Sequence, residues 1–487
     1  MVPVERQKIM GFKGGVLKDD AQWKDLDLTE GKNLMMMGTA LELEKPTQAV
    51  TFIEDLPEQE QDSMLYDLPA GLLNLGNTCY LNATLQCLKN VPELVQTIQK
   101  YKQPTQPSLY SGLVKSSQSL FNEMLKSNSP ISTYAFLSIF RRLFPQFDES
   151  KGGMHLQQDA EEAMSQLMTA YSQELAAPGE TLDAKSPHSA IVAKSIIGKL
   201  FGVEAKEVYT CKDAPNEEAT ERMETLLKLT CNINIDTSYL HEGLKKGLLE
   251  EISKFSPSLQ REAVYNKKTL ITKLPPYLNV QFVRFHWKKD VKESRDSATV
   301  GVKAKIIRAV QFPFTLDVFD LCTPELKEKL SVKRKIMDDI YNDSSLKRKP
   351  EDEEMADAPA EKKPDNTKQA AVSTALDAPI DIKSNDTGKY ELTAVLTHQG
   401  RFADSGHYVA WVKKEDNVWM KFDDSIVSTH NNEDIKKLFG GGEWHMAYIL
   451  IYRSVTVDAP ATTTTDTKDE SSSSSTTTTT TTTSTTQ

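Results

Sequence analysis

The stretch GLLNLGNTCYLNATLQCL (residues 71–88) holds two of the chain's five cysteines and could supply a thiol nucleophile. Three leucines recur in its second half at spacings of four and three: Leu81, Leu85 and Leu88. This spacing predicts a helix with one apolar face, and Thr78 is a suitable N-cap because its hydroxyl can accept a backbone N–H. Cys79 then lies in the first helical turn, where the helix dipole favours a thiolate. Cys87, two turns further on, is interpreted as a core residue, and a packing role also stays open for Cys79.

An amide that could serve this thiol lies five residues before it. Asn74 is in a segment flanked by Gly71 and Gly76, and glycine lets the backbone turn tightly. An amide at such a turn could donate to the carbonyl oxygen that Cys79 attacks, which is worth roughly 3 kcal/mol in the transition state. The alternative is an ordinary strand, turn and helix.

A thiol nucleophile needs a base, and a base usually needs a third group to orient it. His407 begins the alternating pattern HYVAWV, Lys414 to Asn417 predict a turn, and VWMKF predicts the returning strand. Pairing across this turn places His407 opposite Asp424, and a single bulge would bring Asp423 there instead. The hairpin is therefore predicted to deliver a carboxylate beside the histidine. The alternative is a structural histidine in a sheet.

The remaining histidines offer no comparable arrangement. His398 lies on the strand pattern YELTAVLTH and is interpreted as structural, and the others are His155, His188, His241, His286, His430 and His445. The chain has no HExxH sequence, which argues against a zinc protease of that type.

The elements that must position these residues lie in a chain of 487 residues whose composition changes along its length. Residues 1–40 predict short strands and turns, with strands in RQKIMGF and NLMMMG, and residues 41–68 predict a linker. Helical and strand patterns alternate over residues 69–454. Within them, about 335–388 are highly charged and predict a disordered insertion, and the Thr/Ser-rich tail at 455–487 predicts disorder as well.

Composition excludes several classes of protein. The net charge of −11 argues against general nucleic-acid binding and fits a basic protein partner. Scattered cysteines without a CxxC pair argue against a paired-cysteine zinc site and fit a reducing cytoplasm or nucleus. No apolar run reaches about eighteen residues, so no membrane span is expected. The N-terminus lacks a secretory signal pattern.

Several motifs together resemble the ubiquitin-specific proteases, a family of papain-like cysteine deubiquitinases. GLLNLGNTCYLNATLQCL is similar to the family's cysteine box, and YELTAVLTHQGRFADSGHYVAWV with WMKFDDS and AYILIY is similar to its histidine box. HLQQDAEE resembles its glutamine-glutamine-aspartate box, and LPPYLNVQFVRF resembles a strand between the boxes. The resemblance covers about Leu68 to Tyr452. It implies an α+β fold with thumb, palm and fingers.

The resemblance also implies roles for individual residues. Cys79 matches the nucleophile, His407 the base and Asp423 the orienting acid, with Asp424 in reserve, and Asn74 matches the oxyanion donor. The implied reaction is hydrolysis of the isopeptide bond after the C-terminal glycine of ubiquitin.

Contacts to the tail of ubiquitin are expected around the glutamine-glutamine-aspartate box and the start of the histidine strand. The residues are Gln158, Asp159, Glu162, Gly406 and Tyr408. Asp159 and Glu162 are three apart and could pair with guanidinium groups of the tail; the alternative is acidic decoration of a helix start. Many family members bind zinc through four finger cysteines, but only Cys211 and Cys231 fall in this region, so neither zinc nor another cofactor is expected.

Further stretches resemble the proteasome-associated branch of the family: LFGVE, TPELKEKL, SPSLQREA and LTHQGR. This resemblance implies the proteasome regulatory particle and ubiquitinated proteins as partners, and low activity before docking. Residues 400–406 resemble a loop that covers the groove at rest. A cytoplasmic location is expected. The basic run at 347–349 leaves a nuclear one open, although such a run is commonly only solvated charge.

Residues 4–38 resemble the second half of a ubiquitin-like domain, without its first hairpin and main helix. The strand at Asn33–Met37 would then expose an edge and apolar side chains. Two other functions stay open from sequence alone: a catalytically idle ubiquitin receptor that regulates the proteasome, and a papain-like protease with another substrate.

Overall fold

The computed structural model describes most of the chain from Leu68 onward and short stretches before it. The described residues are 8–12, 15–17, 22, 34–37, 68–183, 185–288, 302–346, 382–401, 405–442 and 444–456. Internal contacts divide the chain into two compact units, Met1–Asp67 and Leu68–Gln487. The predicted linker at 41–68, except Leu68, and the predicted tail at 455–487, except its first two residues, lie outside the described residues.

The first unit contains a small antiparallel sheet in the order β2-β1-β3. Its strands are β1 (Lys8–Phe12), β2 (Gly15–Val16) and β3 (Met35–Met37), where the RQKIMGF and NLMMMG patterns predict strands. Every methionine of β3 is more than half exposed, because this strand pairs only with β1 among the described residues. The ubiquitin-like character of this segment stays a prediction.

The second unit is built on an eight-stranded sheet, the palm. Its order is β18-β17-β16-β15-β19-β11-β8, with β14 paired to β15. The strands are β8 (Leu229–Asn232), β11 (Tyr277–Val283), β14 (Thr315–Asp317), β15 (Lys389–Gln399), β16 (His407–Glu415), β17 (Val418–Asp423), β18 (Ile426–His430) and β19 (Met446–Ser454). Side chains alternate between its two faces, so Tyr408 and Ala410 of β16 join one core, and Val409 and Trp411 join the other.

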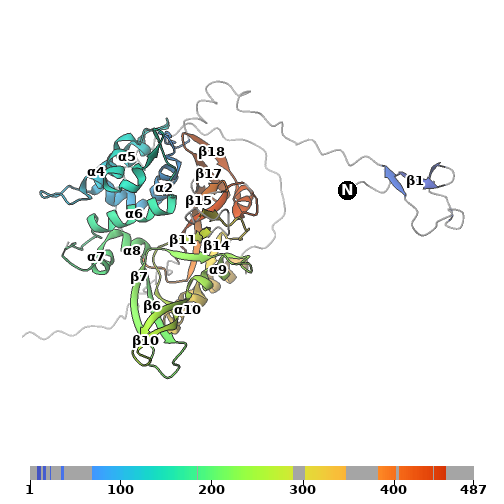
Figure 1. Cartoon of the computed structure of the whole chain (residues 1–487). Coiled ribbons are helices and arrows are strands. Elements are labelled where there is room, and N and C mark those ends of the chain that lie inside the picture. The colour runs from blue at the N-terminus through green and yellow to red at the C-terminus, as the bar shows by residue number, and fades with distance from the viewer. Residues whose placement is uncertain are drawn as a thin grey trace, which may run out of the picture. The chain divides into compact units, whose positions relative to one another are not determined.

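A helical lobe, the thumb, packs on one face of the palm (Figure 1). It contains α2 (Cys79–Lys89), α3 (Pro92–Lys100), α4 (Ser111–Lys126), α5 (Tyr134–Leu143), η4 (Pro145–Asp148), β4 (Ser150–Lys151), β5 (Met154–His155), α6 (Ala160–Glu174), α7 (His188–Lys194) and α8 (Ile196–Phe201). Helix α2 lies centrally, packs against α6 and β16, and is buried except for Lys89. The leucine spacing therefore predicted the helix correctly, although the helix is buried on nearly all sides and not along one apolar face alone.

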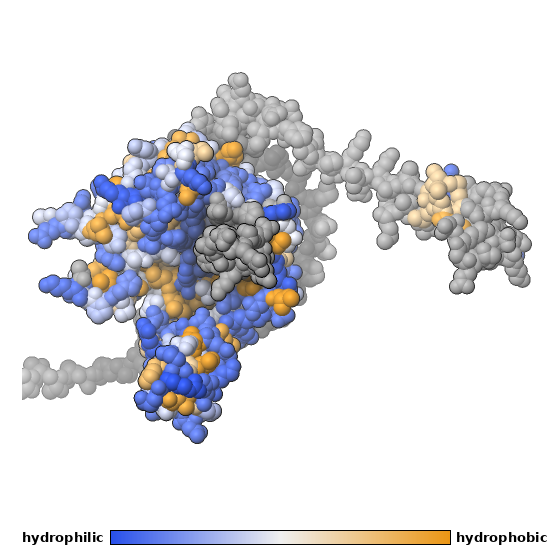
Figure 2. All heavy atoms as spheres, in the orientation of Figure 1, coloured by the Kyte–Doolittle hydropathy of each residue, from blue (hydrophilic) through white to orange (hydrophobic). Residues whose placement is uncertain are grey.

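The fingers form a separate four-stranded antiparallel sheet in the order β7-β6-β10-β9. Its strands are β6 (Val203–Cys211), β7 (Thr220–Leu226), β9 (Leu249–Ser256) and β10 (Arg261–Lys273), and they extend from the palm (Figure 1). Hydrophobic side chains interrupt the hydrophilic surface of this region (Figure 2). Four apolar residues of these strands are exposed: Met223, Leu249, Phe255 and Val264.

Shorter elements complete the second unit. They are α9 (Leu240–Gly247), β12 (Phe285–Lys288), β13 (Val302–Lys305), η5 (Phe319–Leu321), α10 (Pro324–Leu346), α12 (Asn432–Lys436) and η6 (Lys437–Phe439). Together the thumb, palm and fingers confirm the predicted α+β, papain-like architecture. Within the described residues, no helix combines the length and apolarity that a membrane span requires.

Two boundary predictions differ from the structure. The predicted insertion was placed from about 335, but α10, which packs against β10 and η5, continues to Leu346. At the far end, Asn385 and Thr387 are buried before β15, so the chain is ordered again from residue 382. Residues 347–381, including the basic run at 347–349, lie outside the described residues.

The two cysteines that the sequence assigns to the fingers belong to different sheets. Cys211 ends β6 and packs with Ala263 and Tyr265, whereas Cys231 lies in β8 of the palm. They therefore do not form half of a shared metal site.

Candidate active site

Cys79 is the first residue of α2, as predicted, and its side chain is 2% exposed. The predicted side-chain cap is wrong. The Thr78 hydroxyl accepts a hydrogen bond from the Leu75 N–H at 2.9 Å and does not cap α2. The backbone carbonyl of Thr78 closes the first turn instead, because it accepts from the N–H groups of Leu81 and Asn82. The thiol therefore lies at the positive end of a buried helix.

His407 begins β16 and Asp423 ends β17, so the hairpin brings the ring and the carboxylate together. His407 Nε2 lies 2.6 Å from Asp423 Oδ1. The pKa of His407 is raised to about 10, mainly by the hydrogen bond to Asp423 and secondly by interaction with Cys79. Because Nε2 is occupied by the carboxylate, Nδ1 is the ring nitrogen that remains for the thiol. The imidazolium form is thus favoured between a carboxylate and a sulfur atom.

The choice between the two aspartates follows from where β17 ends. The hydrogen bond from His407 holds the pKa of Asp423 well below its usual range. Asp424 has a left-handed backbone, with φ of 53°, so its side chain leaves the strand direction. It accepts instead from the amides of Asn74 and Asn82, each at 2.8 Å. The acid preferred from the resemblance, Asp423, is the one beside the histidine.

Asn74 is fixed at both ends of its amide. Its Oδ1 accepts from the backbone N–H of Gly76 at 2.9 Å and of Thr78 at 3.3 Å, and its Nδ2 donates to Asp424 at 2.8 Å. The turn that permits this has positive φ at Gly76 (96°) and Asn77 (54°). An amide has two N–H groups, so one remains available to a substrate oxygen.

The glutamine-glutamine-aspartate box contacts the histidine strand through Gln157, which the sequence-based site did not include. Gln157 Nε2 donates to the Gly406 carbonyl at 2.5 Å, directly before His407. Asp159 is the N-cap of α6, and its Oδ1 accepts from the Glu161 N–H at 2.9 Å and the Tyr448 hydroxyl at 2.8 Å. The box therefore connects the thumb to the palm.

The other residues predicted to contact ubiquitin differ in accessibility. Gln158 is half-buried and Glu162 is exposed, with its carboxylate 3.4 Å from the Gln146 amide. Tyr408 is 1% exposed and packs beside Tyr448, with ring centroids 6.2 Å apart. The expectation that its side chain contacts ubiquitin is thus not supported, because alternation along β16 turns it into the core.

A buried basic cluster lies behind the loop that leads to His407. Lys305 Nζ donates to His398 Nδ1 at 2.7 Å and to the carbonyls of His398 and Gly400 at 2.8 and 3.0 Å. Burial lowers the pKa of Lys305 to about 7 and that of His398 to about 3. His398 is therefore a neutral structural residue, as predicted.

His445 also belongs to the surroundings of the site, which its sequence context did not indicate. It is 3% exposed, and its ring centroid lies 6.4 Å from that of His407. Burial lowers the pKa of His445 to about 4. It supplies an uncharged wall beside the imidazolium.

One group of three residues among those described has the spacing of a metal site. The ligand atoms of His407, Asp423 and Asp424 lie within 4.8 Å of one another. These atoms already bind each other or the two asparagine amides. Hydrogen bonding therefore accounts for the cluster.

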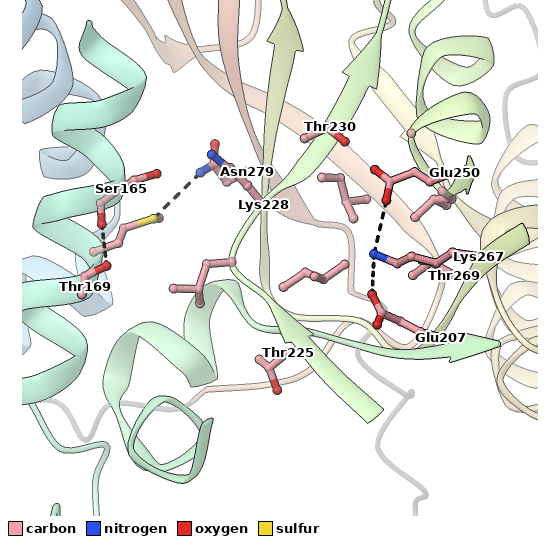
Figure 3. Close-up of a pocket in the computed structure, with 16 residues that line it drawn as sticks. Ser165, Thr169, Glu207, Thr225, Lys228, Thr230, Glu250, Lys267, Thr269 and Asn279 are labelled. Atoms are coloured by element: carbon pink, nitrogen blue, oxygen red, sulfur yellow. Dashed lines mark hydrogen bonds and ion pairs between the residues drawn. The ribbon is translucent and has the colours of Figure 1, made fainter. Parts of the chain in front are cut away.

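A pocket of about 330 Å³ separates the thumb from the fingers (Figure 3). Ser165 and Thr169 of α6 line one side. Lys267 lines the other and bridges Glu207 at 2.8 Å and Glu250 at 3.4 Å. This side is the opposite face of the finger strands from Val264, because side chains alternate along β10. The lining is mixed: leucine and methionine side chains lie between the polar and charged groups.

Comparisons with known proteins agree with this arrangement. The family model described as ubiquitin carboxyl-terminal hydrolase matches residues 70–452. Ubiquitin carboxyl-terminal hydrolase 7 of Arabidopsis thaliana is 42% identical over 459 residues, which cover 93% of this chain and 91% of that protein. Ubiquitin carboxyl-terminal hydrolase 6 of Schizosaccharomyces pombe is 38% identical, covering 93% and 92%. Ubiquitin carboxyl-terminal hydrolase 14 of Caenorhabditis elegans is 33% identical, covering 92% and 86%. The chain therefore belongs to the ubiquitin carboxyl-terminal hydrolase family, the ubiquitin-specific proteases, and is a cysteine-type deubiquitinating enzyme.

Proposed function

We propose that the chain hydrolyses the isopeptide bond after the C-terminal glycine of ubiquitin through the thiol of Cys79. The observation that carries this assignment is the His407–Asp423 pair at 2.6 Å. Cys79 is close enough to this imidazole to contribute, after Asp423, to its raised pKa. Thiol catalysis of acyl transfer needs a nucleophile, a base beside it and an acid that orients the base.

In the proposed first step, the Cys79 thiolate attacks the glycine carbonyl and His407 carries the proton on Nδ1. The carbonyl oxygen becomes an oxyanion, to which the free N–H of Asn74 donates. His407 then protonates the lysine amine, which leaves as the C–N bond breaks. Water, deprotonated by His407, hydrolyses the thioester and releases ubiquitin with a free carboxylate.

The tail of ubiquitin is proposed to pass between the thumb and the palm on its way to Cys79. Gln158 and Gly406 would border its path, and Glu162 is an accessible carboxylate for an arginine of the tail. Asp159 would act by holding α6 and Tyr448 in place. The body of ubiquitin would rest against the pocket between α6 and the fingers (Figure 3).

The enzyme is further proposed to trim ubiquitin from substrates bound at the proteasome regulatory particle. Support comes from the resemblance of four stretches to the proteasome-associated branch of the family, now located in α8 to β6, α10, the β9–β10 turn and β15. The proposed compartments are the cytoplasm and, as a second proposal, the nucleus, because both are reducing and keep the thiol active.

The test is reaction with ubiquitin that carries a C-terminal electrophile, with and without purified proteasomes. A covalent adduct in the wild-type chain and none in Cys79→Ala is expected, with faster labelling on proteasomes. A Cys87→Ala variant is the matched control and should still be labelled. Absence of any adduct under both conditions would refute the hydrolase assignment, and an equal rate under both would refute only the proteasome proposal.

A further inference from the structure

We propose that Lys421 is a positioning residue that fixes the carboxylate of Asp423 for its contact with His407. The two carboxylate oxygens have different partners: Oδ1 lies 2.6 Å from His407 Nε2, and Oδ2 lies 2.8 Å from Lys421 Nζ. A cation on one oxygen leaves the other directed at the ring. The inference rests on the proposed function, because it assigns Asp423 to the catalytic machinery.

The lysine is itself held in place by the neighbouring strand. Lys421 of β17 lies directly opposite Trp411 of β16 in the sheet register. Its ammonium lies 5.6 Å from the centre of the Trp411 ring, a cation–π geometry. Trp411 is 3% exposed, and its Nε1 donates to Thr397 Oγ1 at 3.1 Å. A rigid aromatic ring therefore supports the long side chain and restricts its rotamers.

Asp423 needs such support because it is accessible to water. Its side chain is 30% exposed, and the terminal torsion of an aspartate rotates over a broad range. Without Lys421, water would compete for Oδ2 and the carboxylate could turn away from His407. Misplacing a catalytic group by about 1 Å can cost about 10²-fold in rate.

A purely structural ion pair would behave differently. Pairs at partly exposed sites contribute little to folding, so a structural Lys421 would alter neither stability nor rate by much. The chain offers a matched control in Lys413, whose side chain is 17% exposed against 18% for Lys421. Lys413 also bonds carboxylates, those of Glu391 and Asp416, but both lie outside the active site.

The experiment compares Lys421→Met, Lys421→Arg and Lys413→Met with the wild-type full-length chain on ubiquitin carrying a fluorogenic C-terminal amide, with proteasomes present. Lys421→Met is expected to lower kcat by about 10- to 100-fold with little change in KM. Lys421→Arg should keep most of the rate because its guanidinium can bind Oδ2. Lys413→Met should keep the wild-type kcat, and urea unfolding should give similar midpoints for both methionine variants.

Each contrary result has a distinct meaning. If the wild-type chain is active and Lys421→Met retains its kcat, the positioning role is overturned while the proposed function stands. An equal loss in Lys413→Met, or no rescue by Lys421→Arg, would likewise overturn the positioning role. A wild-type chain that is inactive on this substrate, and unlabelled by the ubiquitin electrophile, would overturn the proposed function and the role of Lys421 with it.

Discussion

The side-chain amide of Asn74 donates to Asp424 at 2.8 Å, although the two residues are 350 positions apart in the sequence. This bond, together with the Gly76 and Thr78 N–H groups on the other end of the amide, leaves Asn74 with one orientation. An oxyanion donor must be oriented before the reaction, because reorganisation during the step would cost part of its benefit. Asp424 therefore serves the site through Asn74, and Asp423 through His407.

Removal of the proposed oxyanion donor should affect the chemical step alone. We expect Asn74→Ala to lower kcat by roughly 10²- to 10³-fold with KM nearly unchanged, since the donor acts on charge that develops in the transition state. Asn90→Ala is the matched control, because its amide donates to the Thr393 carbonyl at the other end of the same helix. Steady-state kinetics would argue against the assignment if both variants lost the same activity.

Substitutions of the two neighbouring aspartates should have different effects on the pH dependence of kcat/KM. Asp423 is the largest cause that raises the pKa of His407 to about 10, so Asp423→Ala should move this pKa down toward 6.5. The active form needs a protonated imidazole beside the thiolate, so the alkaline limb of kcat/KM should move to lower pH. We also expect kcat at pH 8 to fall by roughly 10²-fold or more.

Asp424→Ala provides the comparison for that profile. It should lower kcat through the released Asn74 amide but leave the alkaline limb where the wild-type chain has it. Equal displacement of the limb in both variants, measured from pH 6 to 10, would contradict the separate roles of the two acids.

The sequence was sufficient for the elements that carry the site, but not for its fine geometry. Leucine spacing predicted α2, and the alternating pattern predicted the β16–β17 hairpin. The predicted register was one residue off, because the turn is closed by Glu415 and Val418, later than expected; a bulge between Lys413 and Glu415 then sets the pairing of Ala410 with Phe422. The positive φ of Asp424 decides which acid contacts the histidine. The alternating hydrophobic pattern of the strand does not predict this backbone conformation.

Contacts between distant polar residues could not be predicted from local patterns. Gln157 and Gly406 are 249 positions apart, and Lys305 and His398 are 93 apart. Lys305 donates to a histidine and two backbone carbonyls, so no oppositely charged residue and no periodic pattern in the sequence indicates these contacts. Only the folded chain, in which β13 lies beside the end of β15, brings these groups together.

Gly406 should be intolerant of even one added carbon. A Cβ at this position would lie 2.2 Å from the Gln399 carbonyl oxygen and 2.4 Å from His398 Nε2, and φ is +149°. Gly406→Ala should therefore displace the residue before His407, lower kcat, and lower the free energy of unfolding by about 1–3 kcal/mol. In contrast, Gly112→Ala in α4 meets no atom within 4 Å and should be neutral or stabilising by up to about 1 kcal/mol. Wild-type activity and stability in Gly406→Ala would show that the site tolerates a Cβ at this position and would contradict the prediction.

The buried histidines predict that the free energy of unfolding decreases on the acid side of neutral pH. Burial lowers the pKa of His398 to about 3 and of His445 to about 4, from 6.5 in the unfolded chain. Below pH 6.5 the unfolded chain therefore binds more protons than the folded chain, and the free energy of unfolding decreases as the pH falls. The expected loss at pH 5 is about 2 kcal/mol for each histidine. His407 has the opposite sign: its stabilisation is complete below pH 6.5 and is lost as the pH rises toward 10.

Urea unfolding at pH 5, 6.5 and 8 should accordingly show a smaller free energy of unfolding at pH 5 than at pH 6.5. Above pH 7 the lowered pKa of Lys305 has the opposite sign to His407 and offsets its loss. His398→Asn tests the acid side, since its side-chain oxygen can still accept from Lys305 but does not titrate. This variant should lose about half of the decrease between pH 6.5 and 5, because His445 still contributes the other half. Most carboxylates titrate below pH 5, so they do not obscure this window. An unchanged slope in His398→Asn would show that the buried ring is not the source of the acid-side loss.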